Sequence, residues 1–425
     1  MKYPGTVVAA LLVAGCAATP SSNAPAQAAD PGKSAGAAGT DAQSTEPARE
    51  SFRDWLDGFR SEARNRGIAD ATLATALDGA EFLPRVIELD RSQPEFTRQI
   101  WDYLDTAASD TRVETGRNRL AEHRDAIEAA ASRYGLRPEI LVAIWGLESN
   151  YGSNFGDTRT VDALATLAYE GRRRDFARKQ LFAALEILDS GDISADRMRG
   201  SWAGAMGHTQ FIPTSFQAYA MDGDGDGKRD IWGSIPDVMA STAHYLAEAG
   251  WDTGDPWGLE VRLPEGFDYA SADGRTRQSA SGWAADGVRP ASGGSLPQLD
   301  DAAIITPAGA RGPAFLVGPN FRTILRYNNA TSYALAVGRL ADRIAGAGPL
   351  VAEWPRGLAA MSRDQIEEMQ GLLNDAGFNA GTPDGIMGPN TRGALRQFQA
   401  SIGLVPDGFP TFALLERLRQ TVAES

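Results

Sequence analysis

Helical periodicity dominates the central part of the sequence. Apolar residues recur at spacings of three and four from Phe52 to Phe59, and this pattern returns in the segments 118–134, 138–150, 160–169, 175–189, 236–249 and 331–345. Such spacing places apolar side chains on one helix face, which has to be buried against another element. Only 258–318 departs from it, with short β-prone runs between Gly, Pro, Ser and Asp. We therefore predict an α+β class, predominantly α-helical, with a small β-containing insertion.

Composition narrows the chemistry that such a fold can carry. Of 425 residues, 43% are hydrophobic and 23% charged, which is ordinary for a soluble globular protein. Lys plus Arg number 41 against 55 acids, and this net charge of −14 argues against generic nucleic-acid binding. One cysteine excludes disulfides within the chain, and three histidines leave little room for a His-rich metal site. The chemistry must rest mainly on carboxylates, hydroxyls and aromatic rings.

The N-terminus has the features of a secretory signal. Lys2 precedes a short apolar run, 7–14, which is far below the ~20 residues of a transmembrane helix. The sequence from Leu12 to Cys16 resembles the bacterial lipobox. That resemblance implies that residues 1–15 are removed and that Cys16 carries a lipid. Ala17 in place of aspartate favours the outer membrane, so we expect a lipid anchor at its periplasmic face in a Gram-negative-type bacterium.

Two composition shifts divide the rest of the chain. Residues 16–50 are rich in Ala, Ser, Gly, Pro and Thr and lack apolar periodicity, which predicts a flexible tether. A Gly- and Pro-rich linker at 346–357 separates a large body, 51–345, from a small C-terminal module, 358–422.

The C-terminal module contains an internal near-repeat. Ser362 and Gln365 form a capping-box pattern that opens a helix. The turns 383–385 and 406–408 both read Pro-Asp-Gly, and each is followed by a threonine and a helix. This pattern resembles the three-helix peptidoglycan-binding module of cell-wall enzymes. The alternative is a helical domain of no known kind.

One helix places a carboxylate among apolar residues. Ile140, Ile144 and Glu148 lie four residues apart in a helix that opens at Pro138. Desolvation and the negative end of the helix both disfavour the charged form, so we expect the pKa of Glu148 to rise. A carboxyl group that is protonated near neutral pH is suited to general acid catalysis of glycoside cleavage. The alternative is a glutamate paired with an arginine across the core.

A second segment, 201–213, contains a run of small residues, Ala-Gly-Ala at 203–205, and such a run lets backbone approach backbone or a ligand closely. Taken alone, it indicates tight helix packing. Together, however, Glu-Ser-Asn-Tyr-Gly at 148–152, this segment and Arg-Tyr-Asn-Asn at 326–329 resemble the membrane-bound B family of lytic murein transglycosylases. The three motifs occur in the order of that family, and the resemblance covers nearly all of 51–345.

The resemblance implies a lysozyme-like fold that cleaves the β-1,4 bond between N-acetylmuramic acid and N-acetylglucosamine in peptidoglycan and leaves 1,6-anhydromuramoyl ends. It implies no cofactor for catalysis. Hydrolases of this kind need a second carboxylate about 5–9.5 Å from the first, and none accompanies Glu148 in the three motifs. If Glu148 acts first as acid and then as base toward the sugar's own 6-hydroxyl, one carboxylate suffices.

The resemblance also implies substrate contacts. The residues that it places in the cleft are Ser201, Gln210, Tyr245, Tyr327 and Asn328. Tyr103 is a further candidate, with a core aromatic as the alternative. Arg172 and Arg173, in a run of three arginines, are candidates for pairing with carboxylates of the peptide stems, against a solvated helix face.

An acidic loop at 222–230 matches the start of an EF-hand. The predicted ligands are Asp222, Asp224, Asp226, Lys228 (through its backbone carbonyl) and Asp237. Gly233 stands where an EF-hand has its bidentate glutamate, and Asp237 on the next helix replaces that glutamate. We expect a structural Ca²⁺ site, against an Asp/Gly turn that stays empty.

Three other functions remain open at this point. A muramidase would use water and leave reducing ends, and the missing second carboxylate argues against it. A lipid-anchored, inactive peptidoglycan-binding scaffold would have no need to bury an acid at position 148. A calcium-dependent lectin-like lipoprotein rests on the acidic loop alone.

Overall fold

A computed structural model describes residues 45–91 and 98–424 of the chain. The predicted signal peptide, Cys16 and most of the predicted tether lie outside the described residues. The first helix begins at Thr45, before the body's predicted start at residue 51. Among the described helices, none has the length and apolar character needed to cross a membrane.

The helices agree with the predicted periodic segments in most places. They are α1 (Thr45–Asn65), α2 (Asp70–Leu77), α3 (Pro84–Arg91), α4 (Ile100–Ala107), α5 (Asp110–Glu122), α6 (Arg124–Tyr134), α7 (Pro138–Ser149), α8 (Thr160–Glu170), α9 (Arg174–Ser190), α10 (Pro213–Tyr219), α11 (Ile235–Glu248), α12 (Ala280–Ala285), α13 (Pro319–Tyr327), α14 (Thr331–Ile344), α15 (Arg363–Asp375), α16 (Pro389–Ser401) and α17 (Phe412–Ala423). The segment 118–134 is not one helix, because the chain turns at His123 between α5 and α6. The short helices α2, α3, α4 and α10 carry too few turns to give a periodic signal.

The predicted β-containing insertion is an antiparallel five-stranded sheet in the order β4-β6-β7-β3-β5. Its strands are β3 (Gly258–Arg262), β4 (Asp273–Gln278), β5 (Arg289–Pro290), β6 (Ala302–Ile305) and β7 (Ala314–Val317). β6 and β7 are buried along their whole length, so they read as continuous apolar runs. A separate antiparallel pair, β1 (Thr158–Arg159) and β2 (Arg199–Gly200), brings together the chain segments before α8 and after α9.

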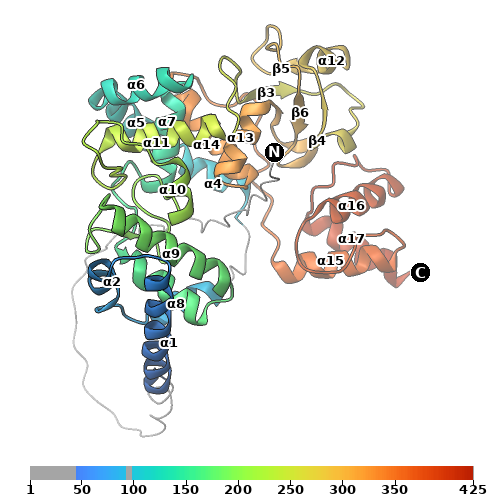
Figure 1. Ribbon diagram of the computed structural model, residues 1–425. Coiled ribbons are helices and arrows are strands. Elements are labelled where there is room, and N and C mark those ends of the chain that lie inside the picture. Colours follow the sequence, from blue (N-terminus) through green and yellow to red (C-terminus); the bar gives the residue numbers. More distant parts are fainter. Residues whose placement is uncertain (1–44, 92–97, 425) are drawn as a thin grey trace, which may run out of the picture.

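The core of the body is built around α7. Every residue from Ile140 to Gly146 is buried, because α5, α6, α11 and α14 pack around this helix. In Figure 1 these helices form one group, α1, α2, α8 and α9 a second, and the sheet with α12 a third. A helix enclosed on all sides has an apolar residue at nearly every position, as α7 does.

Helices α15, α16 and α17 form a separate lobe with its own apolar core (Figure 1). The capping box is present, since Ser362 and Gln365 each accept from the other's backbone N–H. Both Pro-Asp-Gly turns are fixed by a glutamine. Gln370 accepts from the backbone N–H of Asp384, and Gln399 accepts from that of Gly408. In each copy, a glutamine side chain is thus hydrogen-bonded to the aspartate and the backbone of the Pro-Asp-Gly turn, an arrangement that we call the glutamine bracket. The near-repeat in the sequence is a repeat of this bracket.

Gly338 on α14 provides a test of the packing of the body. A Cβ at position 338 would collide with the buried indole of Trp257, whose Nε1 donates to Asp342 at 3.0 Å. Because neither group can move freely, Gly338→Ala should lower the free energy of unfolding by about 1–3 kcal/mol. Gly58→Ala is the matched control, since nothing lies within 4 Å of a Cβ on this exposed residue of α1. The control should be neutral or slightly stabilising in calorimetry, and equal melting temperatures for both variants would contradict this packing.

Candidate active site

Glu148 lies in the last turn of α7, where the chain leaves the helix in an unusual way. Asn150 and Tyr151 both have left-handed backbone conformations, with φ of 48° and 58°. Residues other than glycine rarely adopt these backbone angles, so tertiary contacts must hold Asn150 and Tyr151 in this conformation. Ser149, fully buried, supplies one such contact, because its Oγ accepts from the backbone N–H of Gly152 at 3.1 Å.

Tyr151 folds back beneath the helix that precedes it. Its hydroxyl donates to the carbonyl of Arg112 on α5 at 2.7 Å, and only 3% of the residue is exposed. A Cβ at Gly146 would come within 2.6 Å of its ring, and one at Gly116 within 2.7 Å of its hydroxyl oxygen. The Tyr and the Ser of the first motif are thus the groups that fix the turn after Glu148.

His208 covers the same turn from the other side. Its ring lies against the Cα of Gly152, where any side chain would collide with it. Its Nδ1 accepts from the indole Nε1 of Trp145 at 3.2 Å. Burial, partly offset by Asp230, lowers the pKa of His208 to about 4, so the ring is neutral near pH 7. The contacts of this histidine are those of a positioning residue, a role that no pattern in the sequence indicates.

The carboxyl group of Glu148 is half-buried and has no cationic partner among the described residues. Burial raises its pKa from 4.5 to about 7, against an opposing effect of the Tyr333 hydroxyl. Tyr333, in the first turn of α14, donates to Oε1 of Glu148 at 2.5 Å. The expected rise in pKa is confirmed in direction, and the alternative of a buried Glu–Arg pair is wrong.

No second carboxylate contributes to the pKa of Glu148 within residues 45–91 and 98–424. Its neighbours are phenols. Burial raises the pKa values of four tyrosines, and the nearby Glu148 raises each of them further: Tyr103, Tyr245, Tyr327 and Tyr333. Tyr103 and Tyr245 reach about 12. These hydroxyls stay protonated and can act as hydrogen-bond donors around one acid.

Three of the sequence-predicted residues thus gather at Glu148, and Tyr333 joins them. Tyr327 donates to the carbonyl of Thr209 at 2.6 Å, and its ring lies 4.7 Å from that of Tyr245. Tyr245 donates to the carbonyl of Arg326, which ties α11 to α13. Tyr333 was missed because a tyrosine on the apolar face of a helix is usually a core residue, and no motif contains it.

Ser201 and Gln210 stand at the two ends of a tight loop. The backbone N–H of Ser201 donates to the Ala205 carbonyl at 2.8 Å, and its Oγ accepts from the Ala205 N–H. Gln210 has φ of 52° and donates through Nε2 to the carbonyls of Phe155 and Gly207. The small residues between them allow this approach, as the sequence indicated. Asn328 ends α13 next to Tyr327 and is partly exposed.

Arg172 and Arg173 lie elsewhere, at the exposed turn between α8 and α9. Nε of Arg172 is 3.5 Å from a carboxylate oxygen of Asp90, and the guanidinium of Arg173 lies over the ring of Phe176. In the described part of the chain, no hydrogen bond or ion pair joins either arginine to Glu148 or its tyrosines.

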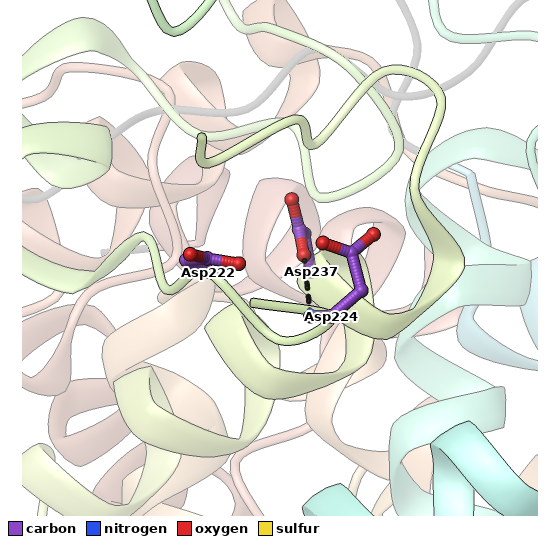
Figure 2. A group of neighbouring side chains, drawn as sticks. All are labelled: Asp222, Asp224 and Asp237. Carbon is purple, nitrogen blue, oxygen red and sulfur yellow. Dashed lines mark hydrogen bonds between the residues drawn. The ribbon is translucent and has the colours of Figure 1, made fainter. Parts of the chain in front are cut away.

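Three of the predicted metal ligands converge. Ligand oxygens of Asp222, Asp224 and Asp237 all lie within 4.8 Å of one another, and Figure 2 shows the three carboxylates facing a common space. Asp237 is 0% exposed, and its carboxylate accepts from the backbone N–H groups of Gly223, Asp224 and Asp230. Burial and the nearby Asp224 raise its pKa. Asp237 is a buried acid beside two others, and no Lys or Arg among the described residues forms an ion pair with it. Such a group of carboxylates suits a divalent cation.

Asp226 does not join this group. It is exposed, and its Oδ1 accepts from the backbone N–H of Lys228 at 2.8 Å. The cluster of carboxylates found in the described residues is therefore smaller than the loop pattern predicted, and it does not include Asp226. The backbone carbonyl of Lys228 stays a prediction.

Comparison with known proteins identifies the two parts of the chain. Residues 51–342 match the family described as Transglycosylase SLT domain, and residues 362–418 match the putative peptidoglycan binding domain. The chain belongs to the transglycosylase SLT domain family. This confirms the family, the helical fold and the C-terminal module that the motifs predicted.

Individual relatives agree with this family. SltB3 from Pseudomonas aeruginosa, in its crystal structure with NAG-anhNAM-pentapeptide, superposes with a TM-score of 0.84 at 52% identity, covering 87% of this chain and 99% of that one. The membrane-bound lytic murein transglycosylase B of Escherichia coli is 36% identical over 231 residues, which are 53% of this chain and 61% of that protein. The E. coli lytic transglycosylase Slt35 in complex with calcium has a TM-score of 0.59 at 32% identity, covering 68% of this chain and 92% of that one.

The raised pKa of Glu148 should make the stability of the protein depend on pH. Because the folded state binds the proton more tightly than the unfolded chain, the contribution of Glu148 to stability is lost as the pH rises from 4.5 to 7. Glu148→Gln removes that loss and should stabilise the protein at pH 8 by about 1–3 kcal/mol, with little effect at pH 4. Glu114→Gln, at an exposed position on α5, is the control and should unfold like the wild type at both pH values. Equal unfolding of all three proteins at pH 8 would contradict the assigned pKa.

Proposed function

We propose that this protein is a peptidoglycan lytic transglycosylase that cleaves the β-1,4 bond between N-acetylmuramic acid and N-acetylglucosamine and forms 1,6-anhydromuramoyl ends. The observation that carries the proposal is a single half-buried carboxyl group, Glu148, with a pKa of about 7 and no carboxylate partner among the described residues. The complex of SltB3 with NAG-anhNAM-pentapeptide supports the product.

Glu148 serves both proton transfers. Protonated, it donates to the glycosidic oxygen as the bond to the anomeric carbon breaks. The carboxylate then takes the proton of the muramic acid 6-hydroxyl, whose oxygen bonds to the anomeric carbon. The nucleophile belongs to the substrate, so it is already close and no second carboxylate is needed to activate water. The donated and the recovered proton balance, and the enzyme returns to its starting state.

The surrounding hydroxyls position the sugar and tune the acid. Tyr333 donates to Oε1 of Glu148, which stabilises the carboxylate and leaves the other oxygen for proton transfer. Ser201, Gln210, Tyr103, Tyr245, Tyr327 and Asn328 are the proposed substrate contacts. Arg172 and Arg173, more distant from Glu148, are proposed to meet peptide-stem carboxylates.

The division of the chain completes the proposal. Residues 1–15 form a lipoprotein signal, 16–50 a tether from lipidated Cys16, 51–345 the catalytic domain, 346–357 a linker and 358–422 the peptidoglycan-binding domain. A lipid at Cys16 anchors the enzyme at the periplasmic face of the outer membrane. The name of the E. coli relative, a membrane-bound enzyme, supports this location.

Mass spectrometry of products from purified murein tests the reaction. The wild type should release muropeptides with anhydromuramic ends. Glu148→Gln keeps the shape and the Tyr333 hydrogen bond but cannot transfer the proton, so turnover should fall by at least about 100-fold. Binding of the variant to murein should persist.

Two other outcomes would replace this function. Reducing ends from the wild type would make the protein a water-using muramidase. Retained murein binding with no product from the wild type would make it a peptidoglycan-binding scaffold.

We also propose a structural Ca²⁺ at Asp222, Asp224 and Asp237. The calcium complex of Slt35 supports this assignment. Calcium should raise the melting temperature of the wild type, because a ligand that binds only the folded state stabilises it. Asp224→Asn should abolish that rise, since an amide keeps the acceptor for the Asp226 N–H but loses the charge. Asp226→Asn is the matched control and should retain most of the rise; no calcium-dependent change in the wild type would exclude the site.

A further inference from the structure

The segment between the catalytic body and the C-terminal module is attached to the body. The backbone N–H groups of Val351 and Ala352 both donate to the carboxylate of Glu260 on β3, at 2.8 and 2.7 Å. Further along, the ring of Trp354 packs against that of Trp101 on α4, with centroids 6.2 Å apart. The chain therefore enters the module from a fixed position.

The module itself contacts the body through the second Pro-Asp-Gly turn. Oδ1 of Asp407 closes the internal bracket by accepting from Gln399, while Oδ2 accepts from the backbone N–H of Ala310 in the body at 2.9 Å. Phe409, two residues on, is 9% exposed and is buried against Trp101 and Ala308. One turn thus combines a hydrogen bond with an apolar contact across the junction.

The first turn has the same internal bracket, but no hydrogen bond between this turn and the body is found in the described parts of the chain. Oδ1 of Asp384 accepts from Gln370 at 3.0 Å, as Oδ1 of Asp407 does from Gln399. The position equivalent to Phe409 is Ile386, which is 60% exposed. The two copies of the repeat have therefore diverged, and the second copy is the one used against the body.

Helix α4 receives the apolar contact with Phe409, and the body segment to which Asp407 is hydrogen-bonded packs on the same helix through Ala308. Gln99, its N-cap residue, donates through Nε2 to the carbonyl of Ala359 at 3.1 Å. Trp101 packs on Phe409, and Asp105 is bound by both terminal nitrogens of Arg356. An eight-residue helix has little stability of its own and depends on such tertiary contacts.

Helix α4 also carries Tyr103 of the proposed cleft. Tyr103 lies two residues after Trp101, is partly buried, and is close enough to Glu148 for the carboxylate to raise its pKa. Its position relative to the acid therefore depends on how α4 is held. α14, which carries Tyr333, holds it from one side, and the junction with the C-terminal module holds it from another.

We propose that the C-terminal module has a second function besides binding the wall: it braces α4 and so positions Tyr103 in the catalytic cleft. Asp407 and Phe409 are then positioning residues, which act on the reaction through Trp101 and α4. This inference rests on the proposed function, specifically on Tyr103 as a cleft residue. It implies that the catalytic body works poorly without the module, even on a substrate that needs no wall binding.

The internal repeat supplies matched controls for the test. Phe409→Ala and Asp407→Asn weaken the junction, and the asparagine keeps Oδ1 for the bracket while losing the acceptor for Ala310. Ile386→Ala and Asp384→Asn make the same changes in the first turn, away from the body. The substrate is a soluble, uncrosslinked tetrasaccharide of alternating N-acetylglucosamine and N-acetylmuramic acid with peptide stems, and all variants are made in the full chain.

The junction variants should lower kcat/KM on this substrate by about ten-fold, the scale of a small misplacement in a cleft. The first-turn variants should stay within two-fold of the wild type. Pull-down with purified murein checks that the module still folds and binds. Junction variants as active as their first-turn controls would overturn the proposal.

A double-mutant cycle separates positioning from general destabilisation. If the junction acts through Tyr103, Phe409→Ala should add little to the loss caused by Tyr103→Phe. Full additivity of the two losses would overturn the proposal. The proposal would also be overturned if Tyr103→Phe kept wild-type activity while Phe409→Ala lost activity. In either case, loss of activity in Glu148→Gln would show that the proposed reaction itself stands.

Discussion

The structure depends on keeping one carboxyl group half-buried at the end of α7 without a cation to pair with. Burial of Glu148 is unfavourable for its charged form, and the fold accepts that cost because α7 is enclosed by apolar packing on every side. The left-handed turn after it is held by Ser149, Tyr151 and His208, from three directions. The buried acid and the strained turn after it lower the stability of the fold at the point where the chemistry needs a protonated carboxyl group. Active sites often combine function with such a local loss of stability.

Tyrosine is the residue type that makes such a site workable. Phenols near Glu148 do not compete for its proton near neutral pH, because burial and the carboxylate keep their pKa values high. An arginine or lysine at the same place would lower the pKa of Glu148 and keep it ionised. Tyrosines from α4, α11, α13 and α14 therefore lie around the acid without removing its function, and one of them, Tyr333, donates to its carboxylate.

Many of the helices and several residues near Glu148 could be predicted from the sequence. The residues that could not be predicted were missed for physical reasons. Periodicity located the long helices and the β insertion, and the first and third motifs contain Glu148 and its neighbour Tyr327. Tyr333 and His208 were not identified, because their role comes from contacts between elements distant in the chain. Asp226 followed the spacing of an EF-hand, yet its carboxylate turns to the backbone of its own loop. Spacing predicts which residues share a loop but not where each side chain points.

The C-terminal module shows how a repeat acquires two tasks. Both copies retain the glutamine bracket that fixes the Pro-Asp-Gly turn, so the fold of each turn is preserved. A carboxylate has two oxygens, and the bracket uses one of them, which leaves the second free to bind outside the module. In the second copy that oxygen accepts from Ala310, and an aromatic ring replaces the exposed isoleucine of the first. Divergence at the outer positions alone is sufficient to convert a surface turn into a junction, while the inner positions keep the domain folded.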